Sequence, residues 1–245
     1  GDKKQDVSEI KGEDAKVNWN QEWFDTYHED GTTFGGVTVV KGDSADTITV
    51  TDKGSLTIDL PTQEATEAGN DGKVVTFKDV NLEVKDGGSF SNSSLVTVQN
   101  GSLTVEDGAF TNKEGGVVEL QGGTFTLSVT KADAVKDFTN AGTIVLSDNA
   151  KMTVGSSDNT AVETEDELAL NVGNVEIGQG ATLTNEDKGY PLTKETDSEG
   201  GDDGAETGEA QTLVHFGTVT VDGGKFINAE GARSEGKALV IESVA

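Results

Sequence analysis

The fold is decided by the stretch Gly101-Ser-Leu-Thr-Val-Glu-Asp-Gly-Ala-Phe-Thr-Asn112, which joins an alternating apolar run to a short phrase. The phrase is a large apolar residue, any residue and then asparagine, and it returns along the chain. Its copies are Phe90-Ser-Asn92, Phe110-Thr-Asn112, Phe138-Thr-Asn140, Leu183-Thr-Asn185 and Phe226-Ile-Asn228. Because each copy lies near a run of alternating apolar and polar residues, we interpret it as one corner of a repeating coil. The sequence therefore predicts a solenoid.

Strand signals recur as pairs of apolar residues two positions apart, which period-two alternation places on one face of a half-buried strand. The pairs are Leu56/Ile58, Leu82/Val84, Leu103/Val105, Val118/Leu120, Ile144/Leu146, Val175/Ile177 and Val219/Val221. A second bulky residue follows most pairs: Phe90, Phe110, Phe125, Met152, Leu183 and Phe226. If coils stack about 4.8 Å apart, these residues lie above one another, and we expect a single internal column.

The asparagines of the phrase have two structural interpretations. In stacked coils each side-chain amide can donate to the carbonyl of the next asparagine and so form a ladder. Asparagine also tolerates the left-handed backbone that a sharp corner needs, so these could be ordinary turn residues without a ladder. Both interpretations make the asparagines structural, and neither makes them catalytic.

Uneven spacing between the strand signals predicts acidic insertions at the corners of the coil, because the strands themselves must stay in register. Residues 155–171 and 186–212 are two such insertions, both strongly acidic. The second has the low hydrophobicity and high charge of a mobile loop. We therefore expect one continuous domain over residues 34–245, from which these two loops are extruded.

Residues 1–33 break the repeat and are expected to form an N-terminal cap or linker. Trp19, Trp23 and Tyr27 follow a helical spacing, with Phe24 beside them. An open solenoid end exposes its core and its strand edges, so an amphipathic lid is expected there. The alternative is an aromatic platform for sugar rings, which would need these faces in solvent.

The formal net charge is −27 at pH 7, with 45 acidic residues against 18 basic ones. Such a field repels phosphate backbones and anionic lipid, so we expect no nucleic-acid partner. No stretch approaches the apolar length of a membrane span, and we expect no membrane insertion by this chain. The 32 glycines and the 33% of hydrophobic residues favour a thin, extended core with many turns.

No catalytic, cofactor-binding or metal-binding residue is predicted, and we expect no enzyme activity. His28 and His215 are the only histidines, and the chain has no cysteine. Gly178-Gln-Gly180 begins like a dinucleotide loop but lacks the third glycine. Carboxylates are too abundant for any pair to stand out. The acidic loops offer oxygen ligands for Ca²⁺, but Asp197 to Gly204 does not keep the order of an EF-hand, so calcium stays an alternative to no cofactor.

Three segments resemble the passenger regions of bacterial autotransporters and related surface adhesins. They are Gly101 to Asn112, Gly122-Gly-Thr-Phe-Thr126 and Phe138-Thr-Asn-Ala-Gly-Thr-Ile-Val-Leu146. The resemblance implies a right-handed parallel β-helix displayed outside a Gram-negative cell as a stalk, adhesin or matrix component. Its implied partners are glycans or proteins on host or neighbouring cells.

Two other functions remain open. The first is a self-assembling subunit of an extracellular filament or matrix, because the apolar segment Lys237-Ala-Leu-Val-Ile-Glu242 could be completed by a neighbouring copy. The second is a polysaccharide-active β-helix enzyme, in which two of the many carboxylates would act on a glycan.

Overall fold

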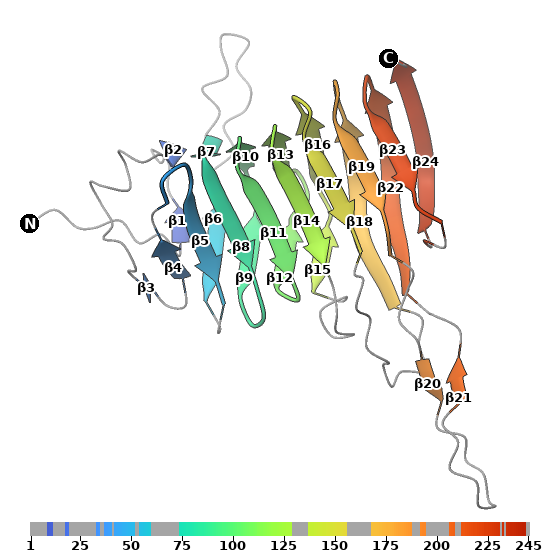
Figure 1. Cartoon of the computed structure of the whole chain (residues 1–245), viewed down its shortest axis with the longest axis horizontal. Coiled ribbons are helices and arrows are strands. Elements are labelled where there is room, and N and C mark those ends of the chain that lie inside the picture. Colours follow the sequence, from blue (N-terminus) through green and yellow to red (C-terminus); the bar gives the residue numbers. More distant parts are fainter. Residues whose placement is uncertain are drawn as a thin grey trace, which may run out of the picture.

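The computed structural model describes residues 9–11, 18–19, 33–34, 37–40, 42–51, 54–59, 74–128, 137–155, 168–187, 192–194, 206–208, 212–230, 232 and 234–243. All regular secondary structure within these ranges is β-strand (Figure 1). The strands pair mainly in parallel. The predicted all-β chain with parallel sheets is therefore confirmed, and the arrangement is compatible with a β-solenoid.

The strands form three rows, and in each row a strand pairs in parallel with the equivalent strand of the next coil. Row one contains β5 (Asp46–Val50), β8 (Val80–Val84), β11 (Ser102–Glu106), β14 (Thr124–Ser128), β17 (Lys151–Val154), β19 (Thr182–Asn185) and β23 (Lys225–Asn228). Row two contains β6 (Ser55–Asp59), β9 (Ser89–Asn92), β12 (Ala109–Asn112) and β15 (Phe138–Asn140).

Row three contains β7 (Val74–Lys78), β10 (Leu95–Gln99), β13 (Val117–Gln121) and β16 (Thr143–Ser147). Three long strands then run through rows two and three together: β18 (Leu168–Ile177), β22 (Thr212–Asp222) and β24 (Ser234–Ser243). The chain thus passes from row one to row two to row three and returns to row one one coil further along (Figure 1).

The N-terminal strands extend this pairing. In row two, β1 (Glu9–Lys11) pairs in parallel with β6, and in row three β2 (Asn18–Trp19) pairs in parallel with β7. Row one ends differently, because β3 (Thr33–Phe34) and β4 (Val37–Val40) add antiparallel strands beside β5. The predicted helix is wrong at Trp19, which lies in a strand, while Trp23, Phe24 and Tyr27 lie outside the described residues.

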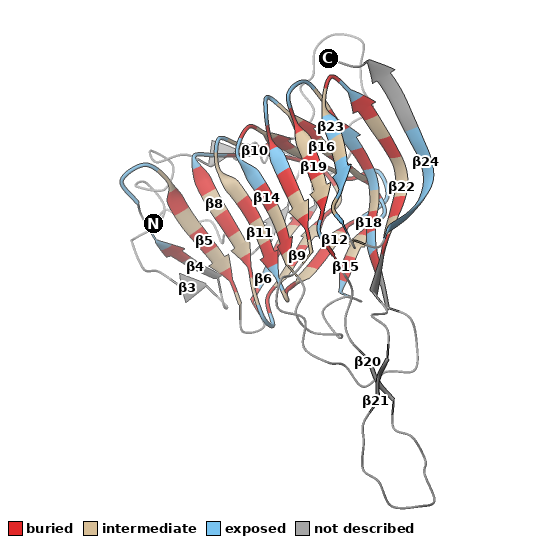
Figure 2. Ribbon diagram, turned by 45° about the vertical axis from the view of Figure 1, so that its right-hand side comes forward, coloured by how far each residue is buried: buried red, intermediate tan, exposed pale blue. Residues whose placement is uncertain are grey.

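One buried apolar cluster runs between the rows, and buried residues alternate with outward-facing ones along the strands (Figure 2). Alternation follows from the period of two in a strand. The predicted bulky residues share this cluster, with Phe226 packed against it, and each buried ring contributes about 1.5–3 kcal/mol before entropy is counted. Their arrangement, however, differs from the single column that we expected.

The bulky residues form two columns that face each other across the core. In row one, Phe125 stacks on Leu103, and the column continues through Met152, Leu183 and Phe226. In row two, Phe110 lies between Phe90 and Phe138, with ring centroids 5.3 and 4.7 Å away. The two columns meet where Phe110 and Phe125 come within 6.0 Å. A single column was expected because alternation of apolar and polar residues identifies a strand but does not say to which of the three rows the strand belongs.

Candidate functional site

The asparagines do form ladders, but at two corners instead of one. Asn92 Nδ2 donates to Asn112 Oδ1, and Asn112 Nδ2 donates to Asn140 Oδ1, each at 2.9 Å, where row two turns into row three. A separate bond of 2.9 Å joins Asn185 Nδ2 to Asn228 Oδ1 at the end of row one. The hydrogen bonds predicted between asparagines are confirmed. The prediction that all copies of the phrase lie at one corner of the coil is wrong.

The corner from row three to row one is fixed by the backbone itself. From β7 onwards its connections are short, and they carry residues with positive φ: Asp79, Asn100, Gly122, Gly123, Asp148, Asn149, Gly180 and Gly223. Glycine, asparagine and aspartate adopt this left-handed backbone most readily. Neighbouring coils also touch here, because a Cβ added at Gly123 would collide with the carbonyl oxygen of Gly101.

The long connections after β14 gather at the corner from row one to row two, which we name the insertion corner. Residues 129–137, 155–167 and 186–211 all join a strand of row one to a strand of row two. Shorter links at the same corner are 51–54, 85–88 and 107–108. Two other long connections lie elsewhere: 60–73 joins row two to row three, and 20–32 joins β2 of row three to β3 beside row one. Three of the five longest connections, including the longest, therefore leave the rows along a single edge.

Both predicted insertions lie at this corner, with shorter bounds than expected. The last residues of the first, Leu168 to Asn171, belong to β18, and Thr212 already belongs to β22. The second insertion contains an antiparallel pair of its own, β20 (Leu192–Lys194) with β21 (Glu206–Gly208), set apart from the rows (Figure 1). The residues proposed for Ca²⁺, Asp197 to Gly204, lie outside the described part, so the calcium alternative stays untested.

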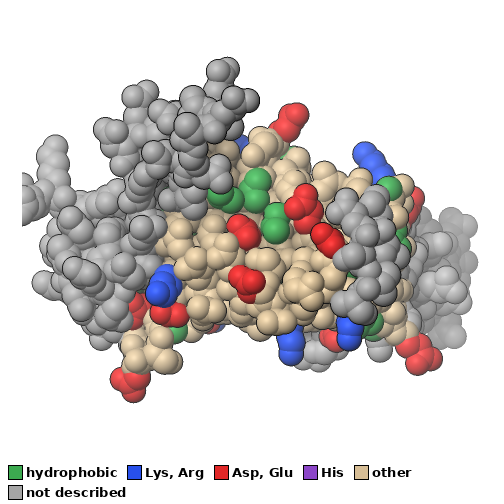
Figure 3. Space-filling view, turned by 90° about the horizontal axis from the view of Figure 1, so that it is seen from above, with side chains coloured by type: hydrophobic (Ala, Val, Ile, Leu, Met, Phe, Trp, Pro, Cys, Tyr) green, Lys and Arg blue, Asp and Glu red, His purple; other side chains and the backbone are tan. Residues whose placement is uncertain are grey.

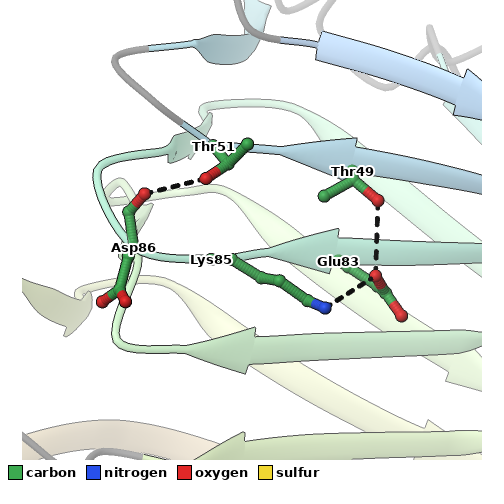
Figure 4. Close-up of polar contacts among 5 residues, drawn as sticks. All are labelled: Thr49, Thr51, Glu83, Lys85 and Asp86. Atoms are coloured by element: carbon green, nitrogen blue, oxygen red, sulfur yellow. Dashed lines mark hydrogen bonds and ion pairs between the residues drawn. The ribbon is translucent and has the colours of Figure 1, made fainter.

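Side chains at the N-terminal end of the insertion corner tie two coils together (Figure 4). Thr51 Oγ1 donates to the backbone oxygen of Asp86 at 2.9 Å, and Thr49 Oγ1 donates to Glu83 Oε2 at 3.3 Å. Lys85 Nζ lies 3.3 Å from the same carboxylate, with both side chains partly in solvent. An exposed ion pair of this kind contributes about 0–1 kcal/mol, so it orients the side chains more than it stabilises the fold.

Charged side chains are distributed over the outer surface of the described residues. No group of three or more His, Cys, Asp or Glu side chains in that part is placed to hold a metal ion. Acidic side chains lie over the middle of the face shown in Figure 3, and lysines lie towards its margins. His215 is in β22 and lines an outer hollow, whereas His28 is not among the described residues. Within the same described ranges, no helix is long and apolar enough to cross a membrane.

No protein-family model, no curated protein and no solved structure matches the chain. What it does must therefore be argued from its own geometry.

Proposed function

We propose that this protein is an extracellular structural or adhesive surface protein, displayed on a bacterial cell and without catalysis. In this proposal the three rows are the faces of a single right-handed parallel β-helix that serves as a stalk. The insertion corner carries the segments that contact glycans or proteins of host or neighbouring cells.

The observation that carries the proposal is the placement of the long connections at the insertion corner. Two residues, 107–108, are enough to join row one to row two. Later coils have longer connections at the same corner, and 186–211 is the longest of them. Long surface insertions cost little free energy, because loop-closure entropy grows only with the logarithm of length. After β14 the long connections all lie at the insertion corner, so this part of the rod presents varied chain along one edge, as a display scaffold requires.

Deletion of the second insertion tests this proposal. In the variant, residues 188–210 are replaced by a short Gly-Asn linker, and labelled protein is applied to epithelial and bacterial cell layers. We expect saturable binding by the full chain, loss of that binding in the variant, and an unchanged β-type circular dichroism spectrum. The matched control shortens 60–73, which lies at a different corner, and should bind normally. Full binding after removal of all three insertions would contradict the proposal.

A second candidate function, self-assembly, is favoured by the exposed end of row three. Val175, Val219 and Leu239 occupy equivalent inward positions in β18, β22 and β24. The exposed fraction of these side chains rises along the stack, from 0% to 4% and then to 58%. Among the described strands, β24 pairs only with β22, so its other edge is open to another strand. Sedimentation velocity between about 1 and 100 µM should then show oligomers that Leu239→Lys abolishes. A monomer over this range would leave only the stalk proposal.

A further inference from the structure

A hollow of about 490 Å³ lies on the outside of the bend where rows two and three meet. One wall is a register column from four successive strands: Thr139, Asn171, His215 and Glu235. Asn174 and Lys237 line it from beyond the bend. Because neighbouring strands lie about 4.8 Å apart, this column extends about 14 Å along the axis of the stack.

Glycine residues leave part of the bend between rows two and three without side chains. Gly173 and Gly217 both line the hollow, and at Gly173 a side chain would strike the backbone of the neighbouring coil. A Cβ at Gly173 would collide with the backbone oxygen of Asn140, and one at Gly217 with Asn174 Oδ1. Beneath them Asn140 is held from inside, since its Nδ2 donates to the oxygens of Val172 at 2.8 Å and Asn174 at 3.1 Å. The wall formed by β15, β18 and β22 is therefore held in place, and the volume of the hollow is in the range of small-molecule sites.

The side chains that line the hollow favour a neutral, hydroxyl-rich ligand. Thr139, Asn171 and His215 can each donate and accept hydrogen bonds, as sugar hydroxyls do. Glu235 and Lys237 supply one negative and one positive charge, so the lining has no excess of either sign. With a net charge of −27 on the whole chain, an anionic ligand would be repelled.

The direction of the hollow separates a sugar chain from a peptide. A peptide that binds a sheet by strand addition needs an unpaired strand edge. The hollow instead lies mainly across β15, β18 and β22, whose backbones are paired on both sides, and among the described strands only β24, at its last wall, has an unpaired edge. Across these three paired strands the hollow offers side chains spaced by the strand repeat, and an extended oligosaccharide presents hydroxyls at a comparable repeat. We infer that this hollow binds a short stretch of a neutral, linear oligosaccharide.

Proton NMR of the full chain tests the inference directly, because His28 and His215 are the only histidines and a His215→Gln spectrum assigns their imidazole signals. Cellotriose, maltotriose and chitotriose are titrated separately to about 10 mM, a range that detects millimolar affinity. At least one should shift the His215 signals saturably and leave those of His28 unchanged. If none of the three moves them, the inference is wrong.

A matched pair of threonine variants locates the site. Thr139→Ala removes a hydroxyl that lines the hollow, and Thr126→Ala removes an outward-facing one from row one. Binding of the active trisaccharide should weaken about three- to tenfold in the first variant, as expected for one lost hydrogen bond, and stay unchanged in the second. Equal weakening of binding in both variants would place the binding site elsewhere.

Tighter binding of trigalacturonate than of any neutral trisaccharide would overturn the ligand class. Because the hollow and the insertion corner are different places, loss of the insertions should leave this binding intact.

Discussion

At the scale of single residues, Phe110 is the side chain on which most of the aromatic packing depends. It is fully buried, stacks between Phe90 and Phe138, and also touches the opposite column at Phe125. We expect Phe110→Ala to lower the free energy of unfolding by about 3–5 kcal/mol, because the large cavity cannot collapse between fixed coils. Chemical denaturation followed by circular dichroism measures this loss.

The control for Phe110 lies at the end of the stack. Phe226 is only partly buried and meets Phe216 edge to face at 5.4 Å. Phe226→Ala therefore removes less buried surface and should cost clearly less than Phe110→Ala. Equal losses would mean that burial does not fall towards the last coil.

The ladder asparagines give a second prediction at this scale. Asn112 accepts from Asn92 and donates to Asn140, and it is fully buried. Asn112→Asp keeps the shape but replaces the donor by an oxygen that faces the Asn140 oxygen, so we expect a loss of at least about 1–3 kcal/mol at neutral pH. Thermal and urea unfolding measure it.

Asn228 is the matched position for the same substitution. It is exposed, its Oδ1 accepts from Asn185 and from Ser234, and among the described residues its amide donates to the oxygen of Ala232. Asn228→Asp retains both accepted bonds and should cost less than about 1 kcal/mol. If both variants were equally stable, the ladder would contribute little.

At the scale of elements, two glycines separate backbone strain from stacking. Gly115 and Gly123 both have positive φ, 79° and 74°. A Cβ at Gly115 meets no atom within 4 Å, whereas one at Gly123 strikes the neighbouring coil at Gly101. We expect Gly115→Ala to cost about 1–2 kcal/mol from the left-handed backbone alone. Gly123→Ala should cost markedly more in the same denaturation experiment, and similar costs would show that the turns are not in contact.

Strands were predictable from the sequence, but their rows were not. Leu103/Val105 and Val118/Leu120 show the same alternation, yet the first pair lies in row one and the second in row three. Alternation reports only which face of a strand is buried. Likewise, Phe110-Thr-Asn112 and Leu183-Thr-Asn185 are copies of the same phrase, but the first ends a strand of row two and the second ends a strand of row one. An asparagine can stack on an equivalent residue wherever a coil turns.

The sequence predicted which residue type adopts the left-handed backbone at a corner, but not at which positions of the chain it does so. The turn interpretation, the alternative to a ladder, gave this conformation to the asparagines of the repeated phrase, whereas the described asparagines that adopt it are Asn100 and Asn149, outside the phrase. The ladder asparagines instead turn their side chains inward and are buried or nearly so, apart from Asn228. A buried amide needs partners, and the stacked neighbour provides one.

At the scale of the whole molecule, the insertions and the hollow differ in how far the sequence could reveal them. Residues 155–171 and 186–212 stand out by charge and by the distance between strand signals, although which corner they share requires the row of each flanking strand. The hollow gives no local signal. Thr139, Asn171, His215 and Glu235 come together only through strand pairing over irregular separations, and none belongs to a recognisable motif.

The stacking of coils also predicts how stability is distributed. Each coil contacts only its neighbours, so a central coil is held from both sides and a terminal coil from one. Core side chains follow this pattern: Val98 and Leu120 are fully buried, while Leu239 in the last described strand is mostly exposed. Local opening should therefore cost least free energy at β24 and most in the middle of the stack.

Hydrogen exchange measured by mass spectrometry tests this gradient. Amides of β10, β11, β13 and β14 should exchange slowest, and protection should fall stepwise through β18 and β22 to β24. Leu239→Ser should speed exchange in β24 and leave β11 unchanged, because the two strands share no contact along their rows. Uniform protection from β5 to β24 would instead show that the rows unfold as one unit, and the nearest-neighbour description of the stack would then be wrong.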